Sequence, residues 1–189
     1  SFVLLIFGVL PAMAEPYLNY NNRPMGTVDS PLVMQTYLPD PGIDAAVFSQ
    51  HHRGEIAPGY TPKEGRDTDG KEKPVDGLPA GIGVNFGPQL SYVFDPVECR
   101  PLYAWQGGFI DLTPYWGDEK RGSRVAKNYV PQLVGILFYK AEGKHPLSID
   151  GKAVGKPEYI GYSLEKGVPR FSFKAGSHEI SVITKPSKD

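Results

Sequence analysis

The chemically richest stretch of this 189-residue chain is Cys99–Trp116, which reads C-R-P-L-Y-A-W-Q-G-G-F-I-D-L-T-P-Y-W. It holds both tryptophans of the protein together with two tyrosines, an aspartate and an arginine. Flat aromatic rings beside a few directional polar groups can bind the faces of sugars, because ligand sites are mostly apolar with few placed polar contacts. The residues that we assign to ligand contact are Trp105, Asp111, Tyr115 and Trp116, flanked by Arg121 and Arg124.

The same side chains have a structural alternative. Trp105 and Phe109 would then belong to the core, while Tyr103 and Trp116 would be partly buried with their polar tips hydrogen-bonded. Asp111 stands between apolar neighbours, so its burial would require a partner, since an unpaired buried carboxylate is costly. The candidate partners are Arg100, Arg121 and Arg124.

Histidines and acidic residues give no strong metal-binding pattern. His51 and His52 are adjacent, and adjacent side chains of an extended chain point to opposite sides, so surface positions are favoured over a copper, zinc or haem site. Asp67–Gly70 begins like a calcium loop, but Lys71 and Glu72 stand where the EF-hand pattern has an acidic or amide residue and a glycine. We therefore expect no metal and no cofactor.

No catalytic set stands out either. The sequence has no G-x-S-x-G, and Glu98 beside the single cysteine, Cys99, would raise the pKa of the thiol rather than lower it, so we expect a buried structural thiol. Gly81–Gly87 lacks the third glycine of the dinucleotide fingerprint and no helical pattern follows it. No residue is assigned a catalytic role, and a non-enzymatic function is favoured.

Composition indicates what kind of elements must position these residues. Twenty-two glycines and 19 prolines, with 12% aromatic and 40% hydrophobic residues, favour a folded, loop-rich β domain over a helical or disordered chain. The length suits one domain with its own core. A net charge of −1 gives no reason to expect a nucleic-acid partner. One cysteine excludes an intramolecular disulfide framework and a C-x-x-C-H haem attachment.

Short runs with period-two alternation, separated by turn residues, predict strands along the second half of the chain. Arg170–Lys174 alternates strictly, whereas Tyr159–Leu164 has mixed parity. Turns at Glu165–Pro169 and Lys174–His178 predict a three-strand meander, and Gly107–Gly108 suggests a hairpin turn. We predict an all-β fold, an antiparallel β-sandwich with a long irregular, Pro/Gly-rich N-terminal arm. The predicted strands are 31–38, 82–86, 90–94, 100–105, 108–112, 133–140, 147–149, 158–164, 170–174 and 178–184.

The N-terminus has the pattern of an export signal. Phe2–Leu10 is apolar, Pro11 follows, and Ala12 and Ala14 supply the small residues that signal peptidase requires. We predict a signal peptide at residues 1–14, no membrane span after its cleavage, and a periplasmic or extracellular location. Residues 15–79 are expected to form the irregular arm or loop region and 80–189 the β-sandwich domain, with 31–79 packed on it as part of one domain.

A set of distinctive stretches is spread over the chain, at 35–39, 78–82, 92–100, 103–111, Trp116, 159–164 and 168–173. Together they resemble a secreted bacterial domain of poorly defined function that accompanies c-type cytochrome and sugar-dehydrogenase-like propeller modules. The resemblance covers most of residues 31–185, and its most specific part lies within Tyr103–Trp116. It implies an association with periplasmic oxidation of sugars or alcohols, and it transfers no catalytic residue. The chain lacks a C-x-x-C-H of its own, so electron transfer would need a separate cytochrome.

Together these observations favour a secreted, non-enzymatic binding or accessory module of a periplasmic redox or carbohydrate-oxidation system. Its expected partners are carbohydrate and a c-type cytochrome or sugar dehydrogenase. One alternative is a carbohydrate-active hydrolase or lyase, which requires Asp111 to meet a second acid or base such as Glu98, Asp118 or His145. The other is a structural or assembly subunit whose arm at 15–79 wraps a neighbouring chain and orders on binding.

Overall fold

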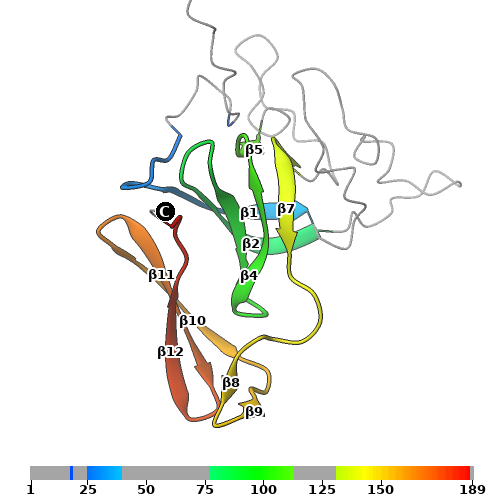
Figure 1. Cartoon of the computed structure of the whole chain (residues 1–189), viewed down its shortest axis with the longest axis vertical. Coiled ribbons are helices and arrows are strands. Elements are labelled where there is room, and N and C mark those ends of the chain that lie inside the picture. Colours follow the sequence, from blue (N-terminus) through cyan, green and yellow to red (C-terminus); the bar gives the residue numbers. More distant parts are fainter. Residues whose placement is uncertain (1–17, 19–24, 40–76, 113–130, 188–189) are drawn as a thin grey trace, which may run out of the picture.

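The computed structural model describes residue 18 and residues 25–39, 77–112 and 131–187 (Figure 1). Within these ranges every regular element is a β-strand and every strand pair is antiparallel. The predicted all-β antiparallel sandwich is therefore confirmed. The predicted signal peptide and most of the predicted arm lie outside these ranges. Nothing in the described part of the chain is a helix long and apolar enough to cross a membrane.

Two principal sheets form the sandwich, and two short ribbons accompany them (Figure 1). The five-stranded sheet has the order β1-β2-β3-β4-β7, and the C-terminal three-stranded sheet has the order β10-β11-β12. The strands of the first sheet are β1 (Leu32–Pro39), β2 (Gly77–Asn85), β3 (Ser91–Asp95), β4 (Arg100–Gln106) and β7 (Ile136–Lys140). Those of the second are β10 (Glu158–Glu165), β11 (Val168–Ala175) and β12 (His178–Ile183). The ribbons are β5 (Ile110–Asp111) with β6 (Gln132–Leu133), and β8 (Ser148–Ile149) with β9 (Lys152–Ala153).

The C-terminal meander follows from its turn residues. β10 and β11 are joined by Lys166 and Gly167, whose φ angles of 51° and 85° are both positive, as a type I′ turn requires. Gly176 begins the next two-residue turn, with a φ of 63°. The meander predicted at this end of the chain is confirmed. Its first turn is shorter than predicted, since it consists of residues 166–167 instead of 165–169.

The inner face of the meander packs on the five-stranded sheet. The strict alternation predicted for β11 places Phe171 and Phe173 on this face, where they are 0% and 1% exposed. Phe171 stacks on Phe94 of β3, with ring centroids 3.9 Å apart and planes 4° apart. This cluster, which we call the inter-sheet core, also takes in residues from β2 and β4. Its buried members are Ile82, Val84, Phe86, Tyr92, Phe94, Cys99, Ala104, Phe171 and Phe173.

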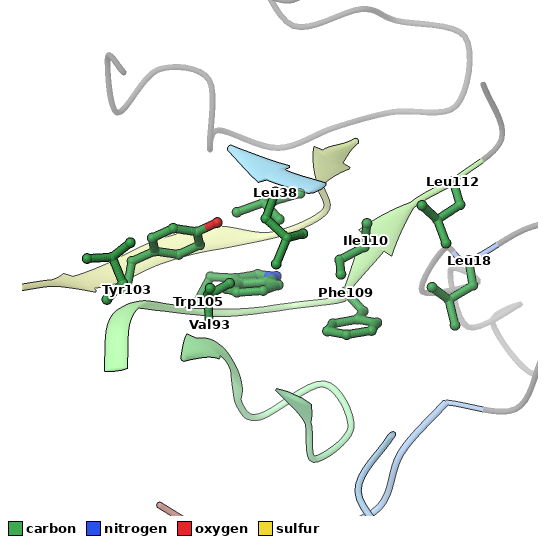
Figure 2. Packing of buried hydrophobic residues seen from close by; sticks show 10 residues of the cluster. Leu18, Leu38, Val93, Tyr103, Trp105, Phe109, Ile110 and Leu112 are labelled. Atoms are coloured by element: carbon green, nitrogen blue, oxygen red, sulfur yellow. The ribbon is translucent and has the colours of Figure 1, made fainter. Parts of the chain in front are cut away.

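The opposite face of the five-stranded sheet buries a second cluster, shown in Figure 2. Here the chain passes close to β2, since a Cβ at Gly83 would lie 3.1 Å from both Ile110 and Phe109. A methyl group at that position would require the side chains of Phe109 and Ile110 to shift by a few tenths of an ångström. We call this cluster the outer core; its buried members are Leu18, Leu38, Val93, Leu102, Tyr103, Trp105, Phe109, Ile110, Leu112 and Leu133.

Asn85, at the end of β2, is fully buried and uses both ends of its amide. Its Oδ1 accepts the backbone N–H groups of Gly26 (3.0 Å) and Gly87 (3.1 Å), and its Nδ2 donates to the Gly87 carbonyl (2.9 Å) and to Oγ of Ser91 (2.8 Å). Ser91 in turn donates to the carbonyl of Gly108 (2.7 Å). The polar side-chain atoms of Asn85 and Ser91 are all hydrogen-bonded, so their burial leaves no group unpaired. The network ties the backbone at Gly26, Gly87 and Gly108 together.

Loss of the inter-sheet stack should cost much of the stability of the domain. Phe171→Ala is expected to lower the free energy of unfolding by about 3–5 kcal/mol, because it removes a fully buried ring and leaves a cavity. Phe171→Leu should cost about 1.5 kcal/mol or less and provides a folded intermediate case. Phe138→Ala, at a side chain 57% exposed, is the matched control and should change stability by no more than about 0.5 kcal/mol. Urea unfolding followed by circular dichroism measures all three; equal losses for Phe171→Ala and Phe138→Ala would contradict the packing described.

Candidate functional site

Two of the six assigned ligand residues lie within the described ranges, and both are buried. Trp105, near the end of β4, is 1% exposed and lies between Tyr103 and Phe109, with centroid distances of 5.9 Å and 6.0 Å (Figure 2). Its indole therefore presents no face on which a solute in solvent could stack. The structural alternative for Trp105 and Phe109, as members of the core, is the one that the packing bears out.

Asp111, on β5, is 6% exposed and is not without a partner. It stands opposite Gln132 of β6. Tyr115, Trp116, Arg121 and Arg124 lie outside the described residues, in the part of the chain that connects β5 to β6.

The prediction of a hairpin turn at Gly107–Gly108 is wrong. β4 does not pair with β5; β4 pairs with β7, and β5 pairs with β6. The two halves are consecutive parts of one long antiparallel ribbon that is interrupted in the middle, where the N–H of Val134 donates to the carbonyl of Phe109 (2.7 Å). For the same reason the single strand predicted at 133–140 is split into β6 and β7.

Gly135 is the residue that makes this interruption possible. Its φ is 131°, and a Cβ there would collide with the carbonyl of Gln106 and lie 3.0 Å from the Trp105 ring. Only glycine combines this backbone conformation with so close an approach of two chains. Gly135 therefore sets the point at which the ribbon is interrupted, with β6 ending before it and β7, the edge of the five-stranded sheet, beginning after it.

The most exposed aromatic side chains of the described residues lie on that edge. Phe138 and Tyr139 of β7 are 57% and 46% exposed, and Ile136 is 49% exposed. A register shift against β4 falls between Ala104 and Trp105, so that Phe138 is the extra residue of a β-bulge. Bulges redirect side chains and are common beside binding sites. We call Ile136, Phe138 and Tyr139 the β7 edge patch.

Sequence reasoning missed this patch. The run I-L-F-Y at 136–139 falls within the predicted strand 133–140, and an unbroken apolar run is typical of a strand that is buried on both faces, so no local signal marks these side chains as exposed. The exposed side chain of Gln106 stands opposite Ile136 in the register, so an amide borders the patch.

A second group of titratable residues surrounds the bend between β3 and β4. Asp95 accepts the backbone N–H of Val97 (2.7 Å), and burial raises the pKa of its carboxyl. Cys99 has a φ of 51° and is 1% exposed, as the predicted buried thiol requires. Burial, with the carboxylates of Asp95 and Glu98 adding to it, raises the pKa of the Cys99 thiol to about 11. This is the electrostatic opposite of a nucleophilic cysteine.

His145 lies against the same bend with both ring nitrogens engaged. Its Nδ1 accepts the N–H of Leu147 (3.1 Å), so Nε2 carries the proton and donates to the carbonyl of Cys99 (3.3 Å). A histidine held in this way cannot bind a metal without losing one of the two bonds. In the described ranges no group of three or more His, Cys, Asp or Glu residues could hold an ion.

The enzyme alternative needed Asp111 beside Glu98, Asp118 or His145. Glu98 and His145 lie at the bend that begins β4, whereas Asp111 lies beyond its far end, on β5 (Figure 1). Because a strand rises about 3.3 Å per residue, the 12 residues from 100 to 111 separate the two ends by on the order of 30 Å. These groups are not brought together, and Asp118 is outside the described residues. The adjacent histidines, His51 and His52, and the segment 67–70 that resembles the start of a calcium-binding loop also lie outside the described residues.

Comparison of the chain with models of known protein families, with curated proteins and with solved structures found no match.

The close approach at Gly135 predicts a large cost for a single methyl group. Gly135→Ala should lower the free energy of unfolding by more than about 2 kcal/mol, since it combines an unfavourable φ with a collision against backbone. Gly151→Ala is the control, because Gly151 also has a positive φ, 75°, but a Cβ there meets nothing within 4 Å; it should cost about 1 kcal/mol. Chemical denaturation compares the two, and equal losses would show that the ribbon relaxes freely around residue 135.

The raised pKa of the Cys99 thiol predicts slow alkylation of this thiol and a pH dependence of the stability of the protein. At pH 8 the fraction of thiolate at Cys99 should be about a hundredfold lower in the native than in the unfolded chain, because the pKa lies near 11 instead of 9.0. Iodoacetamide should therefore label native protein at least that much more slowly, as mass spectrometry would show.

The same shift favours the native state only while the thiol is protonated. From about pH 9 to about pH 11 the unfolded thiol ionises and the native thiol does not, so stability should fall as the pH rises through this window. Cys99→Ala should remove this part of the pH dependence. A native thiol that reacts as fast as the unfolded one would contradict the assignment.

Proposed function

We propose that this protein is a secreted, non-enzymatic binding module that recognises carbohydrate through the β7 edge patch. The single observation that carries the proposal is the pair of adjacent aromatic side chains, Phe138 and Tyr139, which are about half exposed on the edge strand of an otherwise well-packed sheet. Folding alone gives no reason to leave two aromatic rings in water, since each forgoes a large gain from burial.

A sugar suits this surface for two reasons. The C–H faces of a pyranose are apolar and flat, so they can pack on an aromatic ring while the hydroxyl groups remain at the rim. The amide of Gln106 and the hydroxyl of Tyr139 can exchange hydrogen bonds with such a rim, because each has both a donor and an acceptor.

The environments of the titratable side chains Cys99, His145 and Asp111 also support a binding role. Cys99 is protonated and buried, His145 is engaged at both ring nitrogens, and Asp111 lies far from either. We place the module in a periplasmic redox or carbohydrate-oxidation system, where a c-type cytochrome or a sugar dehydrogenase would supply the redox chemistry. The sequence resemblance motivates this assignment, and the export signal expected at residues 1–14 agrees with it.

Calorimetric titration with a panel of soluble oligosaccharides tests the proposal. Wild type should bind at least one class of sugar, and Phe138→Ala and Tyr139→Ala should each weaken that binding by about tenfold, the usual effect of truncating one aromatic contact at a site centre. Ile183→Ala is the control, because it removes an apolar side chain of similar exposure, 41%, from β12 of the other sheet, away from the β7 edge patch, and should leave the affinity unchanged. No binding across the panel would overturn the proposal.

Tryptophan emission locates the sugar independently. Trp116→Phe leaves Trp105 as the only indole, and because that ring is 1% exposed, ligand should not change its emission. A ligand-dependent shift of Trp105, or loss of binding in Trp116→Phe with Phe138→Ala unaffected, would move the site from β7 to the segment first assigned by sequence.

A further inference from the structure

β10 carries the other concentration of exposed apolar side chains among the described residues. Ile160, Tyr162 and Leu164 are 50%, 43% and 58% exposed, although Phe171 on the neighbouring strand is fully buried. β10 is the edge of its sheet, since the order is β10-β11-β12. An exposed apolar edge strand is a template for pairing with another strand.

The apolar side chains of this edge belong to the inner face of the meander. Tyr162 stands opposite Phe171, with ring centroids 5.8 Å apart, and Leu164 stands opposite Pro169. Both therefore continue the surface that packs on the five-stranded sheet, but they lie beyond the part that this sheet covers. Ser163, between them, points to the polar outer face with Arg170.

The turn determines which backbone groups of β10 face outward. In a two-residue hairpin the closing pair, here Glu165 and Val168, exchanges its hydrogen bonds, and bonded and non-bonded pairs then alternate along the strands. Gly161 and Ser163 thus point their N–H and C=O groups toward β11. Tyr162 and Leu164 point theirs toward the open edge.

We propose that β10 pairs antiparallel with β10 of a second copy of this chain, about a two-fold axis at Ser163. In this register Tyr162 stands opposite Leu164 of the second copy, and Leu164 opposite its Tyr162. All four residues have outward-facing backbone groups, so each pair exchanges two hydrogen bonds and the two meanders become one six-stranded sheet. The exposed apolar side chains of both copies meet on the inner face.

The charges and the strand irregularity fit this register. Glu165 stands opposite Gly161 of the second copy, so no like charges are opposed, and its carboxylate already accepts the guanidinium of Arg170 within its own chain (Nε–Oε2 2.7 Å). The β-bulge of β10 falls between Tyr159 and Gly161. The five residues 161–165 that the pairing uses are regular, and the bulge ends the pairing on either side.

Sedimentation velocity of the full chain over a concentration series tests the pairing. Wild type should form a dimer, and Leu164→Lys should weaken it about a hundredfold, because the substitution occurs twice in a symmetric interface and about tenfold is expected for each. Ile183→Lys is the matched control: it places the same charge at an apolar residue, 41% exposed, on β12 at the other edge of the same sheet, and should leave the dimer unchanged. A wild-type monomer at every concentration, or a dimer insensitive to Leu164→Lys, would overturn the proposal.

A disulfide trap tests the register itself. Ser163 would face its own counterpart as a non-hydrogen-bonded pair with a Cα separation of about 4.5 Å, which a disulfide can span. Ser163→Cys should therefore give a covalent dimer under mild oxidation, whereas Ser181→Cys, on β12, should not; the native Cys99 is buried and takes no part. Equal cross-linking of both variants would refute the register. Neither experiment depends on sugar binding, so this inference stands or falls separately from the proposed function.

Discussion

The stack of Phe94 on Phe171 is the contact on which the fold depends, because it joins the only two large sheets of the described chain. The five-stranded sheet is apolar on both faces and must be covered twice. The meander covers one face through β11, and the β5 segment contributes to the cover of the other face by passing over Gly83 of β2. A sheet buried in this way has only its edges left for contact with other molecules.

The exposed edge of the five-stranded sheet at β7 and that of the three-stranded sheet at β10 offer different surfaces. β7 presents a bulge with two adjacent, exposed aromatic side chains, a surface suited to a small ligand bordered by an amide. β10 presents a regular five-residue stretch with unpaired backbone groups and an apolar row, a shape suited to another strand. The proposed sugar site and the proposed self-association therefore use different surfaces of one sandwich, and such a dimer would display two β7 patches at once, which would raise avidity for a repeating ligand.

Some buried polar groups of the described residues are fully hydrogen-bonded, whereas others have no hydrogen-bond partner. Asn85 has all its hydrogen-bonding groups paired and fixes the chain around the ribbon interruption. By contrast, Nε1 of Trp105, Nε of Arg100 and the hydroxyl of Tyr159 are buried without a partner. Each such group costs stability, and burial also raises the pKa of the Tyr159 phenol to about 12. The stability of the sandwich thus rests on apolar packing more than on polar satisfaction.

Local patterns were sufficient to predict the class of fold and most of the strands, because period-two alternation and turn residues act between neighbours in the chain. Arg170–Lys174, the Lys166-Gly167 turn and the meander are examples. The broken alternation of apolar and polar residues in Tyr159–Leu164 corresponds to the β-bulge between Tyr159 and Gly161. Tertiary structure alone decided that Trp105 is core and Phe138 is surface. Both are aromatic residues in strands, and what distinguishes them is whether a second layer lies over the sheet at that point. Residues far apart in sequence supply that layer, so no local pattern could reveal the candidate site.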